Sequence, residues 1–413
     1  MSASRGGGFI NKLLPELPEA RTMALATLVN TTGNGMFMVV SVLYFTRIVG
    51  IDATRVGVGL TIAGVFGLLA GVPLGHLGDR RGPRELLIAL LILSGFAFAS
   101  LIFVTNWWMF VLFTSIATLL DRGSAAVRAG LIATSVHGPD RIRIRAYLRS
   151  ITNIGLAVGA ALAAFALHFD TRAAYVAVLL ANAASCWFAA WVLRRYRHVA
   201  AIPRAEGAGI TTVFRDRPYV VLTTLMAAMA IQYSILDVGM PLWVTTHTSA
   251  PRVLVSVLFI INTVVVVLFQ VGVSRRVENV TIAARTISAS GLVFFGACVA
   301  FAYASDRSPA WAIVLLVAAA LLHVMGELMQ AAAQFCLSQD LALEHAQGQY
   351  QGLSSTGFSL STMLAPSVMV LLPIGLGVLG WWILGGILVV LGYALVPVIR
   401  WTAATRGRYS VSG

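Results

Sequence analysis

Apolar stretches, each about as long as a membrane-spanning helix, follow one another along the chain between short polar breaks. A helix needs about 20 predominantly apolar residues to cross the hydrocarbon core of a bilayer. Reading for such runs predicts twelve spans: 22–46, 56–77, 86–105, 107–135, 150–168, 174–193, 219–243, 253–273, 286–304, 310–338, 350–372 and 380–399. The pattern therefore predicts an all-α integral membrane protein.

The longest polar stretch between spans divides the predicted helices into six and six. A faint internal repeat at an offset of 198 residues supports this division, because Ser41–Phe45 falls on Gly239–Trp243. A tandem duplication in one orientation produces two parallel halves. We expect a cytoplasmic N-terminal segment (1–21), a six-helix bundle (22–193), a cytoplasmic linker (194–218), a second six-helix bundle (219–399) and a cytoplasmic tail (400–413).

Composition agrees with a chain that is solvated by lipid. Hydrophobic residues make up 58% of the chain and charged residues 11%, whereas soluble proteins carry roughly 25% charged residues. The net charge of +13 comes from short basic clusters between apolar stretches, so it requires no nucleic-acid partner.

The distribution of basic residues predicts the orientation. With the N-terminus in the cytoplasm, most of the 29 lysine and arginine residues fall in cytoplasmic connections, as the positive-inside rule requires. Arg145 and Arg149 are counted there, with Arg141 and Arg143. We expect a multi-pass protein of a bacterial inner membrane with both termini cytoplasmic.

No motif indicates a cofactor or a metal site. The three cysteines, Cys186, Cys298 and Cys336, lie in apolar stretches without pairing or metal-ligand spacing, which is typical of small buried residues. The absence of a phosphate-binding loop disfavours ATP-driven transport by the chain alone. The first apolar stretch has full length, so we expect no cleavable signal peptide.

One specific motif lies between the second and third spans, Gly75-His76-Leu77-Gly78-Asp79-Arg80-Arg81-Gly82-Pro83-Arg84. Its glycines allow a tight turn, and Pro83 suits the first turn of the third span. The simplest interpretation is a charged cytoplasmic loop.

The motif resembles the signature loop of the major facilitator superfamily, G-x-L-a-D-r-x-G-r-r. The matching residues are Gly75, Leu77, Asp79, Arg80, Gly82 and Arg84. The resemblance implies the fold of that family, two six-helix bundles that alternate in access. It also implies that the aspartate and the basic residues latch the halves together on the cytoplasmic side, near the start of the eleventh helix at Gln349-Tyr350.

Within that family, the subclass of drug/proton antiporters has a further signature in the fifth helix. Gly155 and Gly159 have its glycine spacing, but the proline and the final glycines are missing. The resemblance to antiporters is therefore partial.

Ionisable residues inside predicted spans are costly and are functional candidates. In span four, Asp121 and Arg128 share a face, and Arg122 lies beside them. The resemblance makes Arg122 a candidate for the mid-membrane arginine that the family links to proton coupling. The alternative is a structural ion pair of Asp121 with an arginine on a neighbouring helix.

Two later spans carry polar faces of their own. Span seven has Tyr233 and Asp237 on one face, and span ten has His323, Glu327, Gln330 and Gln334 in helical register. A carboxylate in a low-dielectric cavity can exchange a proton near neutral pH, so Asp237 and Glu327 are candidate proton carriers, with His323 as a relay. A satisfied hydrogen-bond network is the alternative, and His323 with Glu327 alone are too few ligands for a metal.

Amides and aromatic residues complete the candidate substrate cavity, which the resemblance places between helices one, four, seven and ten. These candidates are Asn30, Asn34, Phe37, Arg128, Asn153, Tyr233, Trp243, Asn262, Gln330 and Gln334.

The favoured function is secondary active transport, specifically proton-coupled efflux of an amphipathic organic solute or drug that is neutral or cationic. We expect a monomer in membrane lipid whose partners are this small molecule and protons. Proton-coupled uptake of a metabolite uses the same fold equally well. An intramembrane enzyme or a non-transporting receptor is disfavoured, because no protease motif is present and a latch loop is not needed for hydrolysis.

Overall fold

The structure is a computed structural model that describes residues 18–135, 140–199 and 212–409. Within these ranges the chain forms helices and no β-strand. Twelve of the helical segments are long and apolar enough to cross a membrane. The predicted all-α membrane fold with twelve spans is therefore confirmed. Parts of the predicted N-terminal segment, central linker and C-terminal tail lie outside the described residues.

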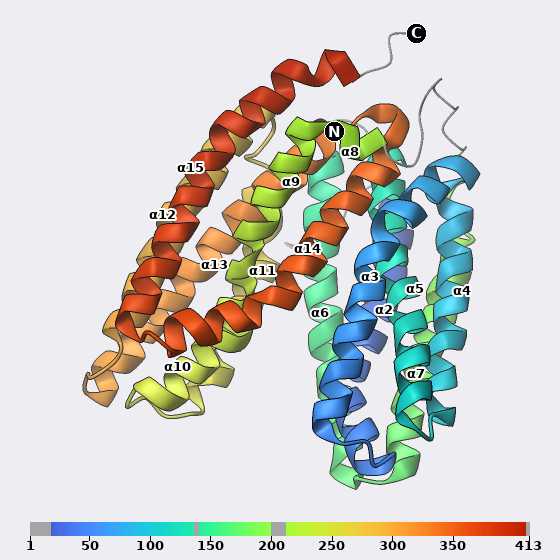
Figure 1. Cartoon of the computed structure of the whole chain (residues 1–413), viewed down its shortest axis with the longest axis horizontal. Coiled ribbons are helices and arrows are strands. Elements are labelled where there is room, and N and C mark those ends of the chain that lie inside the picture. Colours follow the sequence, from blue (N-terminus) through green and yellow to red (C-terminus); the bar gives the residue numbers. More distant parts are fainter. Residues whose placement is uncertain (1–17, 136–139, 200–211, 410–413) are drawn as a thin grey trace, which may run out of the picture.

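The first six spans form the N-terminal bundle (Figure 1). They are α2 (Pro18–Leu43), α3 (Ala53–Arg81), α4 (Pro83–Ser100), α5 (Trp107–Ser135), α6 (Asp140–Phe169) and α7 (Arg172–Leu193). Local signals fix several helix starts: Pro83 occupies the first turn of α4, and the Thr171 hydroxyl accepts a hydrogen bond from the backbone N–H of Ala174 at the start of α7.

The last six spans form the C-terminal bundle, after the short helix α8 (Thr212–Arg215). Its first span is interrupted, running through α9 (Arg217–Met229), the 3₁₀ turn η3 (Ala230–Gln232), the π-turn η4 (Ile235–Gly239) and α10 (Met240–His247). The other spans are α11 (Leu254–Ser274), α12 (Val280–Tyr303), α13 (Pro309–Asp340), α14 (Gln347–Met369) with the π-turn η6 (Val370–Ile374), and α15 (Val378–Tyr409).

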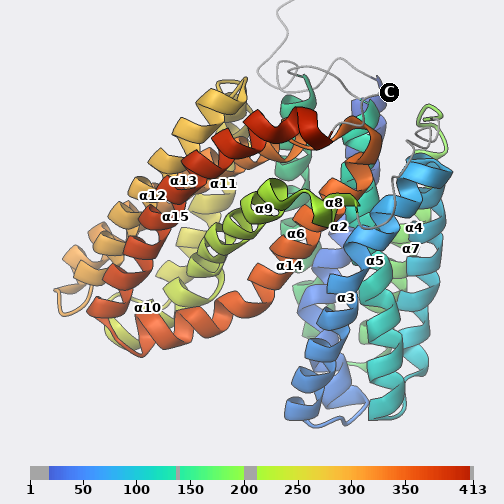
Figure 2. The same cartoon turned by 45° about the horizontal axis from the view of Figure 1, so that its top comes forward.

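The two bundles meet at one end of the molecule and diverge toward the other. In Figures 1 and 2 they approach each other near α8 and separate toward α10. Between the bundles, α3 packs along α14 and α6 packs along α11. Large apolar side chains are exposed on the outer helix faces, including Trp108 at 73% and Phe165 at 68%, as expected for surfaces that face lipid.

Several helices begin or end some residues from the predicted bounds, the largest extension at the C-terminal end being that of α15 to Tyr409, and two of these differences bear on function. Span five was expected from residue 150, but α6 begins at Asp140, so Arg145 and Arg149 belong to a helix and not to a loop. The turn of the signature motif is shorter than expected. Helix α3 continues to Arg81 and α4 begins at Pro83, which leaves only Gly82 between them, at a φ of 91° that favours glycine.

Candidate functional site

Asp79 of the signature motif connects the two bundles. Its buried carboxylate accepts hydrogen bonds from the backbone N–H groups of Gly348, at 2.8 Å, and Gln349, at 3.2 Å. These N–H groups belong to the first turn of α14, where they have no partner within the helix and where the macrodipole favours a negative charge. The aspartate thus caps a helix of the opposite bundle.

Glycines allow α3 and α14 to approach closely beside this cap. A Cβ atom added to Gly75 would overlap the carbonyl oxygen of Gly348, and one added to Gly348 would overlap that of Gly75. Gly71 and Gly352 face each other in the same way one turn along. The two backbones are therefore in direct contact, as in packing of small residues between membrane helices.

Arg84, the last residue of the motif, acts within its own bundle. Its guanidinium donates to the backbone carbonyls of Leu193, at 3.3 Å, and Arg194. It also forms an ion pair with Glu85 at 3.0 Å. Arg84 therefore stabilises the C-terminal end of α7, a position where a cation is favourable. Arg80 acts electrostatically on Asp79.

A buried ion pair joins the bundles near their middle. Glu327 of α13 is 5% exposed, and its Oε1 accepts a hydrogen bond from Arg149 of α6 at 2.5 Å. Its Oε2 accepts from Asn262 Nδ2 of α11 at 2.9 Å. Arg149 also donates to the Tyr233 hydroxyl at 2.7 Å and lies 5.1 Å from the centre of that ring. Such dense hydrogen bonding is what a buried ion pair needs to offset its desolvation.

A cavity of about 500 Å³ lies between the bundles beside this ion pair. Its walls come from α2, α5 and α6 on one side and from Tyr233, α13 and α14 on the other. The lining residues include Asn34, Asp121, Arg122, Arg128, Arg145, Arg149, Tyr233, Gln334, Phe335, Gln351, Ser354 and Phe358. The volume falls in the range of sites for small organic ligands.

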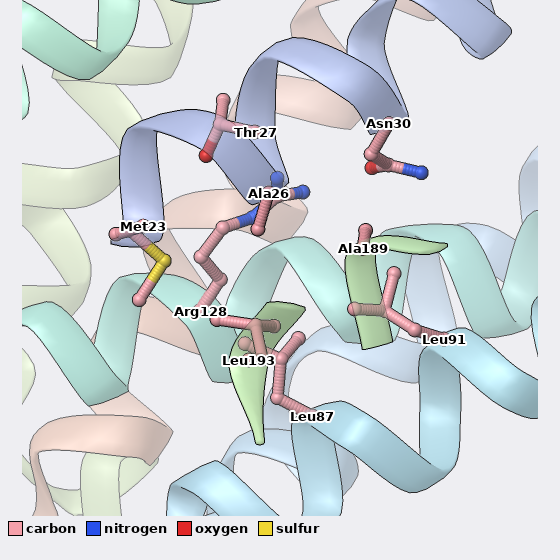
Figure 3. Close-up of a pocket in the computed structure, with 9 residues that line it drawn as sticks. All are labelled: Met23, Ala26, Thr27, Asn30, Leu87, Leu91, Arg128, Ala189 and Leu193. Carbon is pink, nitrogen blue, oxygen red and sulfur yellow. The ribbon is translucent and has the colours of Figure 1, made fainter. Parts of the chain in front are cut away.

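Arg128 also borders a small pocket inside the N-terminal bundle. Figure 3 shows its side chain extending from α5 toward α2, where Thr27 and Asn30 lie. Asn30 is 2% exposed, and its Nδ2 donates to Cys186 Sγ at 3.4 Å. Asn30 therefore lies behind the cavity wall.

The structure brings only part of the predicted site together. Asn34, Asp121, Arg122, Arg128, Tyr233 and Gln334 line the cavity. Asn34 donates to Asp121 Oδ1 at 3.3 Å. Asn262 and Glu327 reach this group through Arg149.

Other predicted cavity residues lie elsewhere. Phe37 packs on Phe98 in the N-terminal core, with ring centroids 5.0 Å apart. Trp243 is buried and donates from Nε1 to the carbonyl of Phe301 at 2.8 Å. Gln330 is buried at 1% exposure, and neither it nor Asn153 belongs to the lining of this cavity.

The two remaining proton-coupling candidates also lie apart from the cavity lining. His323 is 1% exposed, its Nε2 lies 3.1 Å from the carbonyl oxygen of Gln232, and its ring packs against Phe294. Asp237 is exposed in the π-turn η4. The charge of Glu327 acts electrostatically on both residues.

Sequence reasoning missed Arg145 and Arg149 and the contribution of α14. Arg145 donates to Ser338 Oγ at 3.0 Å and to Gln351 Oε1 at 2.7 Å, so it also joins α6 to the opposite bundle. A signal was present, because Arg145, Arg149 and Thr152 recur at steps of four and three residues, the spacing of one helix face.

Comparisons with known proteins agree with this architecture. Residues 23–366 match the sequence model of the family described as Major Facilitator Superfamily. The chain is 24% identical to Multidrug resistance protein MdtH of Cronobacter sakazakii over 324 residues, 78% of each chain. It is 19% identical to the MFS-type transporter YdeE of Escherichia coli (strain K12), over 84% of this chain and 88% of that protein. Among solved structures, a bacterial homologue of the iron transporter ferroportin in an outward-facing state has a TM-score of 0.74 at 17% identity, and the match covers 94% of this chain and 100% of that one. That likeness concerns the fold.

Proposed function

The chain belongs to the Major Facilitator Superfamily, and we propose that it exports an amphipathic organic solute across a bacterial inner membrane in exchange for protons. The observation that carries this proposal is the ion pair between Arg149 and Glu327, which joins the two bundles beside the cavity. The multidrug resistance proteins among its relatives support the choice of an organic solute.

The ion pair is suited to couple a proton to the movement of the bundles. Protonation of Glu327 removes the negative charge that balances Arg149, and with it the charge attraction between these side chains of α6 and α13. The neutral carboxyl retains Asn262 as a partner within its own bundle. In the proposed cycle, a proton that enters from the open end therefore weakens the contact between bundles, and its release restores that contact.

The orientation follows from the positive-inside distribution of basic residues. With both termini cytoplasmic, the bundles are closed toward the cytoplasm, where Asp79 caps α14, and they diverge toward the outside. This is the outward-open state of an alternating-access cycle, and we propose that the monomer performs it. Asp79 stabilises this state because its hydrogen bonds require α3 and α14 to be in contact.

The test begins with a compound panel in a bacterium that lacks its own efflux pumps. Expression of the chain should lower sensitivity to some compounds. Inverted membrane vesicles should then accumulate those compounds, and an uncoupler should abolish accumulation. Glu327→Gln should abolish it as well, whereas Glu278→Gln, at an exposed glutamate in the connection between α11 and α12, should have no effect.

Each contrary result has a defined meaning. Accumulation that survives the uncoupler would refute proton coupling. Increased sensitivity to the panel, with accumulation in right-side-out vesicles, would reverse the direction and make the protein an importer.

A further inference from the structure

The two walls of the cavity differ in chemistry. All charged lining residues belong to the N-terminal bundle: Asp121, Arg122, Arg128, Arg145 and Arg149. All aromatic lining residues belong to the C-terminal bundle: Tyr233, Phe335 and Phe358. We propose that the transported solute is an amphipathic organic anion, whose acidic group binds the arginines and whose apolar body packs on the aromatic wall. This inference rests on the proposed function and names the substrate class of the same cavity.

Positive charge exceeds negative charge on the N-terminal wall. Four of its lining residues are arginines and one is a carboxylate, Asp121. One arginine, Arg149, is balanced by Glu327 across the bundles. Asp121 acts electrostatically on Arg128. Among the described lining residues, no further carboxylate is present to balance Arg122.

Arg122 is the arginine best placed to meet a solute. Its aliphatic part lies against α3, where a Cβ added to Gly67 would come within 3.1 Å of Arg122 Cγ. The residue as a whole is exposed and lines the cavity. A guanidinium in this setting is a donor to carboxylate, sulfonate or phosphate oxygens, which it binds through paired hydrogen bonds.

The surplus of arginines selects against a cationic solute. A cation in the cavity would meet like charges in a medium of low dielectric, where repulsion is stronger than in water. An anion would be attracted into the open end and concentrated there. The sequence-based expectation of a neutral or cationic solute came from a cavity with few charges, several amides and aromatic side chains. Five charged residues line the cavity, and the two carboxylates considered as counter-charges, Asp237 and Glu327, are not among them. Glu327 is paired with Arg149.

The aromatic wall lies next to the arginine side chains. The guanidinium of Arg145 lies 6.0 Å from the ring centre of Phe335, and that of Arg149 lies 5.1 Å from Tyr233. Tyr233 and Phe358 pack edge to face, with ring centroids 5.6 Å apart. We therefore expect the acidic group of the solute to be attached close to its aromatic or aliphatic body, as in an aryl carboxylate or sulfonate.

Equilibrium binding of three matched probes tests which solute charge the cavity prefers. This measurement requires no proton gradient. The probes are 2-naphthoate, 2-naphthamide and 2-naphthylmethylammonium, which share one ring system and differ in charge. Thermal unfolding of the purified full chain in detergent is followed with a thiol-reactive dye, because Cys186, Cys298 and Cys336 are all buried in the folded state. We expect 2-naphthoate to raise the unfolding midpoint and the ammonium probe to leave it unchanged.

Variants of Arg122 test whether 2-naphthoate stabilises the protein by binding in the cavity. Arg122→Gln should weaken 2-naphthoate binding roughly 10-fold, about 1.4 kcal/mol, and Arg122→Lys should restore most of it. The matched control is Arg47→Gln, an exposed arginine that pairs with Asp170 at 3.5 Å on the surface of the N-terminal bundle. It should bind like the unmodified protein.

The possible outcomes separate the two proposals. Stabilisation by the ammonium probe, equal stabilisation by all three probes, or none by any of them would overturn the anionic substrate class. Binding of 2-naphthoate that is lost in Arg47→Gln but not in Arg122→Gln would overturn it too. Transport of a cation that collapses with an uncoupler would leave the proposed function intact, whereas binding that depends on Arg122 without any transport would support the substrate class and refute the function.

Discussion

The carboxylate of Asp79 in α3 lies 2.8 Å from the backbone nitrogen of Gly348 in α14, so an acidic side chain of one bundle caps a helix of the other. In a transport cycle the two bundles must separate at this end. In the proposed cycle, the strength of this cap therefore sets the fraction of time that the protein spends open to the outside.

Removal of the charge of Asp79 should shift this balance. Asp79→Asn weakens two charge-assisted hydrogen bonds, each contributing about 1.5–3 kcal/mol. We expect slower labelling of a cysteine introduced at Ser354, a cavity residue, by a membrane-impermeant thiol reagent added outside. Asp170→Asn, at an exposed aspartate of the N-terminal bundle, is the control and should label at the original rate. Unchanged labelling of the Asp79 variant would show that the cap does not hold the closed end.

Glycine contacts between α3 and α14 predict a steric effect of a single methyl group. Gly75→Ala places its Cβ on the carbonyl of Gly348 and forces the helices apart, at a cost of about 1–3 kcal/mol. We expect a lower thermal unfolding midpoint and reduced transport. Gly64→Ala on the same helix is the matched control, because the nearest atom to its added Cβ is Met363 Sδ at 3.8 Å. Equal effects of both variants would contradict direct backbone contact.

The ion pair of Arg149 and Glu327 should behave as a coupled unit. Arg149→Met leaves Glu327 buried without its counter-charge, and breaking a buried pair in this way costs about 3–5 kcal/mol. The double variant Arg149→Met with Glu327→Leu should recover most of the lost stability. Thermal unfolding of the single and double variants measures this coupling. Additive losses would mean that the two side chains act independently.

Arg84 is expected to stabilise the fold without acting as a gate. Arg84→Gln removes donors to the carbonyls at the end of α7, at a cost of about 1 kcal/mol. The unfolding midpoint should fall, while labelling of the introduced cysteine at Ser354 from outside should stay the same. Slower labelling would instead assign Arg84 to the contact between bundles.

The fold follows from span length and composition, but the cavity depends on where helices begin and which way they face. Arg149 stands close to a cytoplasmic cluster in the sequence, and only the early start of α6 at Asp140 places it inside the bundle. His323 and Trp243 show the reverse case: residue type makes the first a proton-coupling candidate and the second a cavity candidate, yet each contacts a backbone carbonyl within its own bundle. Periodicity identifies a polar face without saying whether a neighbouring helix covers it.

Contacts between residues far apart in the chain could be predicted from the sequence only where a family resemblance existed. That resemblance pointed from Asp79 to the start of α14. The sequence around Gly348 and Gly352 does not indicate that their backbone contacts α3. A helix segment with small residues has the same sequence pattern whether it faces lipid or another helix. The partner of Glu327 was likewise hidden, since Arg149 lies 178 residues away in the chain.

The facing glycines of α3 and α14 have a mechanical consequence. Where side chains interlock, two helices must change rotamers before one can tilt against the other. At Gly71, Gly75, Gly348 and Gly352 backbone lies directly against backbone, and only the side chains of Thr356 and Asp79 reach across beside them. In the proposed cycle, α3 and α14 can therefore part at this end without prior rotamer changes along most of the contact, while the interior of each half keeps its packing.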